Sequence, residues 1–212
     1  MIKQQINISK TFLIICVTCI VIGITAFAYG FISDTQRTWA NYLLNNFYFL
    51  SMAIGATFFL ALQSITQSGW SAGFRRVPEA MMMYIPVAGF LLLLLYFGMH
   101  SIYPWTHPDI VAGNEIIKEK TVFLNIPFFF IRLVLFFSVW TLLLWLIRRA
   151  SLKEDSTGGL ENFAKIEKYS KIFIFVLAVS FSIIGYDLLM SIEPEWFSTI
   201  FALKNFVAAF ML

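Results

Sequence analysis

Long runs of apolar residues constrain the fold of this chain more than any other feature. A helix needs about 20 mostly apolar residues to cross the roughly 30 Å hydrocarbon core of a membrane. Five such runs recur along the 212 residues, at 11–32, 47–66, 83–103, 122–147 and 170–192. The sequence therefore predicts an all-α fold, a polytopic bundle of transmembrane helices that forms one integral membrane domain.

A sixth apolar run begins at residue 198 and continues to residue 212. At about 1.5 Å per residue it is too short to cross the hydrocarbon core. A helix that ends inside a membrane is physically unfavourable, so we expect this sequence to be the N-terminal half of a longer subunit. The first run is too long for a signal peptide and no small-residue cleavage site follows it, so we expect a retained span.

The composition agrees with a chain whose solvent is mostly lipid. Hydrophobic residues make up 59% of the sequence and charged residues only 13%, whereas a soluble domain carries about 25% charged residues. This excludes a disordered chain, a nucleic-acid-binding module and an ordinary cytosolic enzyme. The net charge of +3 is too small to indicate an electrostatic partner.

Lys and Arg side chains gather on one side of the predicted membrane. The N-terminus and the second and fourth loops hold ten of them, whereas the first and third loops hold three. Cytoplasmic loops carry the excess of these residues, so we predict a cytoplasmic N-terminus. The fourth loop contains Gly158-Gly159 and is predicted to be a solvated connector, with a short surface helix over residues 160–168.

The histidines and cysteines do not form a recognisable metal or haem site. His100 and His107 lie at the end of the third run and in the next loop, whereas a transmembrane haem needs axial ligands within the helices. Cys16 and Cys19 lie in the middle of an apolar run, with no second pair to complete a metal site. We interpret them as small packing residues, and we expect no cofactor or metal bound by these side chains.

Ionisable residues inside the predicted spans are the candidate functional residues, because each costs at least about 2.5 kcal/mol to insert. Counted from the ends of the predicted runs, Arg132 lies about 15 Å deep, Asp187 about 7–8 Å and Lys204 about 9 Å. Asp187 and Lys204 lie on consecutive helices joined by a turn that contains Pro194. We therefore expect these two to pair or to share a polar cavity.

Two interpretations of these residues stay open. A buried ion pair fixes helix register without any chemistry, and a lysine extends its ammonium toward the membrane surface. Alternatively, Asp187, His100, Arg132, Lys204 and Glu193 form a proton-transfer or quinone site in the outer half of the membrane.

A further carboxylate lies on the opposite side of the membrane. Glu79 suits the start of the third helix, or it opens a cytoplasmic path for proton uptake. Arg75 and Arg76 are predicted to contact lipid head groups.

Three strings resemble a known family. They are WANYLLNNFYF at 39–49, GWS followed by RRVPEA at 69–80, and YDLLMSIEPEWFST at 186–199. From about residue 10 onward, the chain resembles the F subunit of bacterial alternative complex III, a quinol:electron-acceptor oxidoreductase. That subunit belongs to the NrfD-like superfamily of polysulfide-reductase membrane anchors. The third string is the most specific, and Asp187, Ser191 and Glu193 match the family there.

The resemblance implies an all-helical subunit of about ten spans in the bacterial inner membrane. It implies three kinds of partner, a multihaem cytochrome c, an iron–sulfur subunit and a homologous NrfD-like membrane subunit. Haem c and the iron–sulfur clusters would lie on those partners. For this chain the resemblance leaves open a quinone or quinol pocket, a proton path or a purely structural role.

A different class of function remains as an alternative. A secondary transporter or channel fragment needs polar residues across the bilayer or broken helices near the midplane. In the predicted spans only Arg132 approaches the midplane, which favours the redox-complex interpretation. A structural scaffold is the third interpretation, in which replacement of Asp187 changes no activity.

Overall fold

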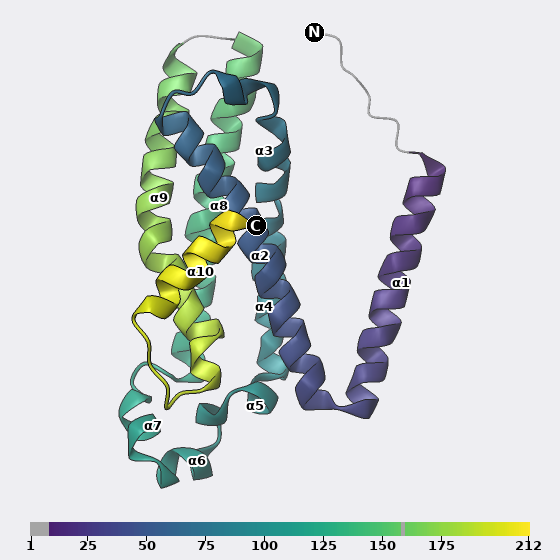
Figure 1. The fold of residues 1–212 in the computed structure, drawn as a ribbon, viewed down its shortest axis with the longest axis vertical. Coiled ribbons are helices and arrows are strands. Elements are labelled where there is room, and N and C mark those ends of the chain that lie inside the picture. Colours follow the sequence, from purple (N-terminus) through teal and green to yellow (C-terminus); the bar gives the residue numbers. More distant parts are fainter. Residues whose placement is uncertain (1–8, 158–159) are drawn as a thin grey trace.

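The computed structural model describes residues 9–157 and 160–212, and within them all regular structure is helical (Figure 1). The α-helices are α1 (Lys10–Ser33), α2 (Thr35–Ile65), α3 (Arg76–Met82), α4 (Tyr84–Leu93), α5 (Met99–Ile102), α6 (Pro108–Gly113), α7 (Glu115–Lys120), α8 (Ile126–Thr157), α9 (Leu160–Leu188) and α10 (Ile200–Met211). Short 3₁₀ helices cover Trp70–Gly73, Leu94–Phe97, Pro104–Thr106 and Met190–Ile192. The predicted all-α fold is confirmed.

Five helical stretches of the described chain are long and apolar enough to cross a membrane, and they match the five predicted runs. They are Lys10–Ser33, Thr35–Ile65, Arg76–Phe97, Ile126–Ser156 and Leu160–Ile192. The third stretch is composite, because α3, α4 and a 3₁₀ turn follow one another. The sixth run forms the shorter apolar helix α10.

Several helix ends differ from the prediction. Helix α2 begins at Thr35 rather than near residue 47, because the Asp34 side chain caps it by accepting a hydrogen bond from the Arg37 N–H. The predicted solvated connector is also largely helical, since α8 continues to Thr157 and residues 160–168 open α9. These stretches are rich in Lys, Glu and Leu, which propagate a helix well. Gly158 and Gly159 lie outside the described residues.

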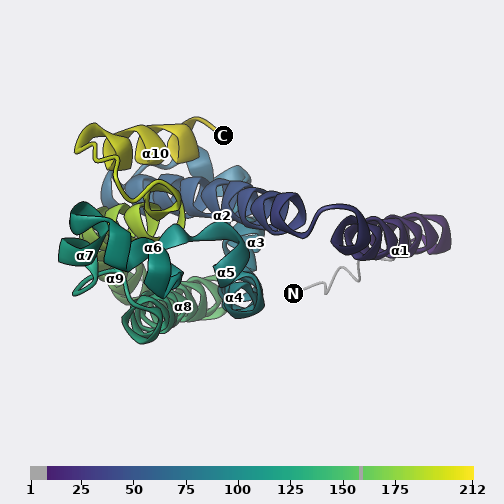
Figure 2. The same cartoon turned by 90° about the horizontal axis from the view of Figure 1, so that it is seen from below.

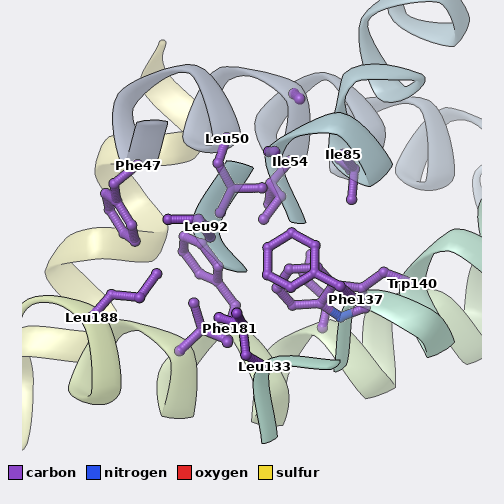
Figure 3. Close-up of a cluster of buried hydrophobic side chains, with 14 of the residues drawn as sticks. Phe47, Leu50, Ile54, Ile85, Leu92, Leu133, Phe137, Trp140, Phe181 and Leu188 are labelled. Carbon is purple, nitrogen blue, oxygen red and sulfur yellow. The ribbon is translucent and has the colours of Figure 1, made fainter. Parts of the chain in front are cut away.

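Helices α2, α4, α8 and α9 form the bundle and enclose its core. Figure 3 shows side chains from all four helices meeting in one apolar cluster. Trp140, Leu92 and Leu50 are completely buried there. The Trp140 indole N–H donates to the Ser180 hydroxyl at 2.8 Å, so its polar atom is satisfied inside the core. This packing sets α8 and α9 side by side, which positions the site described below.

Helix α1 stands apart from the bundle and approaches α2 only near the turn that joins them (Figures 1 and 2). At that turn, the rings of Phe27 and Phe31 pack against Trp39 and Tyr42. No residue of α1 is buried. Cys16 is half-buried and Cys19 is exposed, so the packing role that the sequence predicts for the two cysteines stays a prediction.

Helix α10 crosses the bundle and packs on α2 and α9. Its backbone comes so close to α2 that a Cβ atom added to Gly55 would lie 2.0 Å from the Ala209 carbonyl oxygen. A Cβ atom added to Gly185 of α9 would lie 3.0 Å from the amide nitrogen of the Asn205 side chain. Small residues allow such close backbone approach between membrane helices, so these glycines determine how tightly α10 can pack.

The two ends of the bundle differ in structure. At one end, which we call the cap end, α5, α6 and α7 lie beside residues 193–199 (Figure 1). Asn114 and Lys120 hold these two segments together, by donating to the Glu195 carboxylate at 2.6 Å and to the Pro194 carbonyl. At the other end, which we call the opposite end, the start of α3 lies against the last turns of α8.

The close contact at Gly55 leads to a stability prediction. Gly55→Ala places a methyl group against the α10 backbone, and overpacking of this kind costs about 1–3 kcal/mol. We expect a lower free energy of unfolding in detergent, measured by denaturant titration. Gly23→Ala on α1 is the matched control, because nothing lies within 4 Å of the added atom. Equal stability of the two variants would contradict the tight packing of α10.

Candidate functional site

A buried ion pair between α8 and α9 is the central feature of the cap end. The Arg132 guanidinium donates from Nε to Asp187 Oδ2 and from Nη2 to Asp187 Oδ1, both at 2.7 Å. Arg132 is 5% exposed and Asp187 is 1% exposed. Both belong to helices that are apolar enough to cross a membrane. Two parallel charge-assisted hydrogen bonds are the strongest pairing geometry available to these groups.

The remaining contacts of Arg132 come from the loop before α8 and from the first turn of that helix. Its Nη1 donates to the Phe123 carbonyl at 3.1 Å. Its guanidinium carbon lies 3.9 Å from the centre of the Phe123 ring and 4.2 Å from that of the Phe128 ring. Aromatic rings attract a cation more strongly where water is excluded. The arginine is therefore held by a carboxylate, a carbonyl and two rings together.

The helix ends around the pair are fixed by hydrogen bonds between side chains and the backbone. The Ser191 hydroxyl donates to the carbonyl of Asp187 at 2.5 Å, and the buried Tyr103 hydroxyl donates to that of Leu188 at 2.9 Å. Such bonds satisfy the last carbonyls of α9, which have no partner within the helix. Asn125 caps the start of α8 by accepting from the Phe128 N–H. Both ion-pair residues thus lie within one or two turns of a capped helix end.

This geometry limits what Asp187 can do chemically. Both of its carboxylate oxygens accept charge-assisted hydrogen bonds from Arg132. Protonation of the carboxylate would remove the charge on which those bonds depend. Proton transfer to Asp187 would therefore weaken its pairing with Arg132, and a part of Asp187 in proton transfer stays a prediction.

The expected pairing of Asp187 with Lys204 is wrong, because Asp187 pairs with Arg132 instead; the alternative, a polar cavity shared by Asp187 and Lys204, stays a prediction. Lys204 is exposed on α10. Helix α8 begins at Ile126 rather than at residue 122. Arg132 is the seventh residue of α8 and Asp187 the last but one of α9, so the two lie at the same end of the bundle; the depth of Arg132 in the membrane stays a prediction.

The other candidate residues at the cap end do not join the pair. His100 is exposed on α5, with its ring centre 5.5 Å from that of His107. The carbonyl of His100 lies 2.7 Å from the His107 Nε2. Glu193 is exposed and follows the 3₁₀ turn Met190–Ile192. Their part in proton transfer stays a prediction.

A cavity of about 280 Å³ adjoins the ion pair. It opens between α9, the end of α7 and residues 194–197, and Phe123, whose ring covers Arg132, forms part of its wall. The lining residues are Lys120, Phe123, Leu124, Tyr186, Met190, Ser191, Pro194, Trp196 and Phe197. Apolar walls with few polar groups are typical of small-molecule pockets.

A second ionic cluster lies at the opposite end. Glu79 is 2% exposed and forms ion pairs with Arg75, at 3.2 Å, and with Arg76. Ser151 of α8 also donates to the Glu79 carboxylate. Each arginine also forms an ion pair with a carboxylate of α8, Arg75 with Glu154 and Arg76 with Asp155. Arg75 and Arg76, which the sequence assigns to lipid head groups, thus tie α3 to α8. Proton uptake at Glu79 stays a prediction.

Sequence reasoning missed the aromatic and hydroxyl groups that complete the cap end. Phe128 had a usable signal, since a residue four positions before Arg132 on a helix lies on the same face. Ser191 had the same signal, four positions after Asp187. Tyr103, Phe123 and Lys120 had none, because they come from loops and short helices whose placement depends on tertiary contacts.

The buried pair of Arg132 and Asp187 leads to a prediction about stability. Arg132→Met leaves Asp187 buried without its partner, and breaking a buried pair costs about 3–5 kcal/mol. The double variant Arg132→Met, Asp187→Leu removes both charges and should regain most of that loss. Denaturant titration in detergent measures each variant. The control is Lys204→Met, an exposed change expected to stay within about 0.5 kcal/mol. A control as unstable as Arg132→Met would restore the Asp187–Lys204 pairing.

Comparison with other proteins does not identify the function of this site. No family model matches the chain, and no curated protein matches it. What the site does is therefore argued from its own contacts and from the strings described above.

Proposed function

We propose that this chain is an integral membrane subunit of a respiratory quinol-oxidising complex. In this proposal cytochrome c or another acceptor takes the electrons, and haem c and iron–sulfur clusters on partner subunits carry them. A homologous NrfD-like membrane subunit is the third partner. The chain itself contributes the helix bundle and the polar centre at its cap end.

One observation carries the proposal. The string 186–199, which resembles the family most specifically, is also the segment that builds the candidate site. It supplies Asp187 to the ion pair, the Ser191 hydroxyl to the end of α9, and Pro194, Trp196 and Phe197 to the cavity wall. The residues that resemble the family are thus also the residues that form the ion pair and the cavity. A chance resemblance would have no reason to fall on this site.

The distribution of charge supports an orientation for the proposed subunit. Arg75, Arg76, Arg148 and Arg149 lie at the opposite end, as parts of α3 with its preceding residue and of α8. In the proposed bacterial inner membrane that end would face the cytoplasm, together with the N-terminus. The cap end, with the ion pair and the cavity, would then face outward, where quinol oxidation releases its protons.

The transporter alternative is less well supported by the packing. Ion pairs lie at the two ends of the bundle. Between them α8 and α9 contribute the buried side chains Phe137, Trp140, Phe173 and Leu177. A transport path would have to pass this apolar layer, whereas a subunit that works at one membrane surface has no such need.

The test of this proposal is the set of proteins that accompany the chain. We expect the tagged full-length chain, extracted from its native membrane in mild detergent, to co-purify with a c-type cytochrome and an iron–sulfur protein. Mass spectrometry identifies the partners, and a reduced-minus-oxidised spectrum detects the haem. An unrelated tagged membrane protein from the same cells is the control. A single polypeptide without a haem signal would overturn the proposal.

A further inference from the structure

Two arginines at the opposite end of the bundle lack an acidic partner. Within residues 9–157 and 160–212, neither Arg148 nor Arg149 forms an ion pair with a carboxylate. Arg75 and Arg76, at the same end, are both paired with carboxylates of α8. A guanidinium fits a phosphate through two parallel hydrogen bonds. Arg148 and Arg149 are therefore available to an anion from outside the chain.

Both arginines line one hollow of about 490 Å³ on the surface of the bundle, which we call the basic hollow. Its lining residues are Met83, Trp145, Arg148, Arg149, Leu152 and Lys153. Those from α8 follow one another at spacings that place them on one helix face. The Arg149 guanidinium carbon lies 5.1 Å from the centre of the Trp145 ring. This contact holds the arginine beside the ring.

An apolar groove continues from the basic hollow toward the middle of the bundle. It lies between α4 and α8, which are side by side on the face of the bundle away from α10 (Figure 2), and has a volume of about 570 Å³. Apart from Ser138 and Thr141, its lining residues are apolar or aromatic. Trp145 lines both the groove and the basic hollow, so the two are continuous.

The length of the groove matches one leaflet of a membrane. From Trp145 to Val134, which both line it, α8 rises about 16 Å at 1.5 Å per residue. One leaflet contributes half of a hydrocarbon core of about 30 Å. Tryptophan is enriched where this core meets water, and Arg148 follows Trp145 by one turn. A ligand that fits therefore has an apolar part as long as a leaflet and an anionic end.

We propose that the basic hollow and the groove together bind one anionic phospholipid. Its phosphate accepts hydrogen bonds from Arg148 and Arg149, and one acyl chain lies between α4 and α8. Basic pockets beside membrane helices suit such head groups on the cytoplasmic side. A transmembrane helix of a partner would fill the groove but leave the two arginines without an anion, which favours the lipid. This inference goes beyond the proposed function, because it requires only that the chain lies in a membrane.

The first experiment measures lipid binding to the delipidated full-length chain in detergent by native mass spectrometry. The probes are dioleoylphosphatidylglycerol and dioleoylphosphatidylcholine, which share their acyl chains and differ in net charge. We expect the anionic lipid to bind at least about tenfold more tightly, because the choline group carries a positive charge that the arginines repel. Equal affinities for the two lipids would overturn the proposal.

A pair of double variants tests the basic hollow. Arg148→Gln with Arg149→Gln should lower the affinity for phosphatidylglycerol to that for phosphatidylcholine. The matched control is Lys165→Gln with Lys168→Gln, which removes two exposed positive charges from the same end, on α9, outside the hollow and the groove. It should bind as the wild type does. An equal loss in both double variants would show a response to net charge alone and would overturn the site.

A third variant tests the groove while both arginines are intact. Ser138 is exposed in the groove wall, so Ser138→Phe fills the space assigned to the acyl chain and should weaken the binding of phosphatidylglycerol. Inorganic phosphate at the same concentration as the lipid should not displace it, because phosphate has no acyl chain. Unchanged binding in Ser138→Phe, or displacement by inorganic phosphate, would overturn a lipid as the occupant.

A cross-link in the native membrane distinguishes a lipid from a partner helix. The photoreactive residue p-benzoylphenylalanine replaces Leu142, which lines the groove and is 55% exposed. After illumination, mass spectrometry should find an adduct with the mass of a phospholipid. An adduct with another protein would overturn the proposal. The result is independent of the co-purification test, because the adduct is read on this chain whether or not a cytochrome accompanies it.

Discussion

The pairing of Arg132 with Asp187 is the constraint on which the cap end depends. Neither charge can remain alone among apolar helices, so α8 and α9 must lie antiparallel with these two residues at one level. That register places the Phe123 carbonyl within reach of the arginine and the end of α9 within reach of Tyr103. The loop before α8 is thus held against the pair, and the segment after α4 is held against the end of α9.

The number and type of the helices are predictable from the sequence, because a run of about 20 apolar residues is a signal that needs no tertiary information. The ends of the helices are less predictable. Asp34 acts as a cap that starts α2 early, and the charged residues after Ile147 continue α8 instead of ending it. In both places the predicted boundary is where the sequence changes from apolar to polar. The helix nevertheless extends past that change, because the local residues favour helix.

The residues of the ion pair were predictable, but their pairing was not. Depth along a helix can be counted in sequence, which singles out Arg132, Asp187 and Lys204. The direction of a side chain around the helix axis depends on which neighbours pack against it, and α10 turns Lys204 toward the surface. The cavity could not be predicted from the sequence for a related reason. Lys120 and Trp196 come together only when the two segments that contain them pack against each other.

The isolated position of α1 has a mechanical consequence. The helix contacts α2 near one end only, through an aromatic cluster beside the short turn at Asp34. Its 24 residues form a rod of about 36 Å whose contacts with the bundle lie close to that turn. By simple leverage, a rotation of about 10° at Asp34 would sweep the far end of the rod through about 6 Å. Small changes in the rings of Phe31 and Trp39 would therefore be amplified at the distant membrane surface.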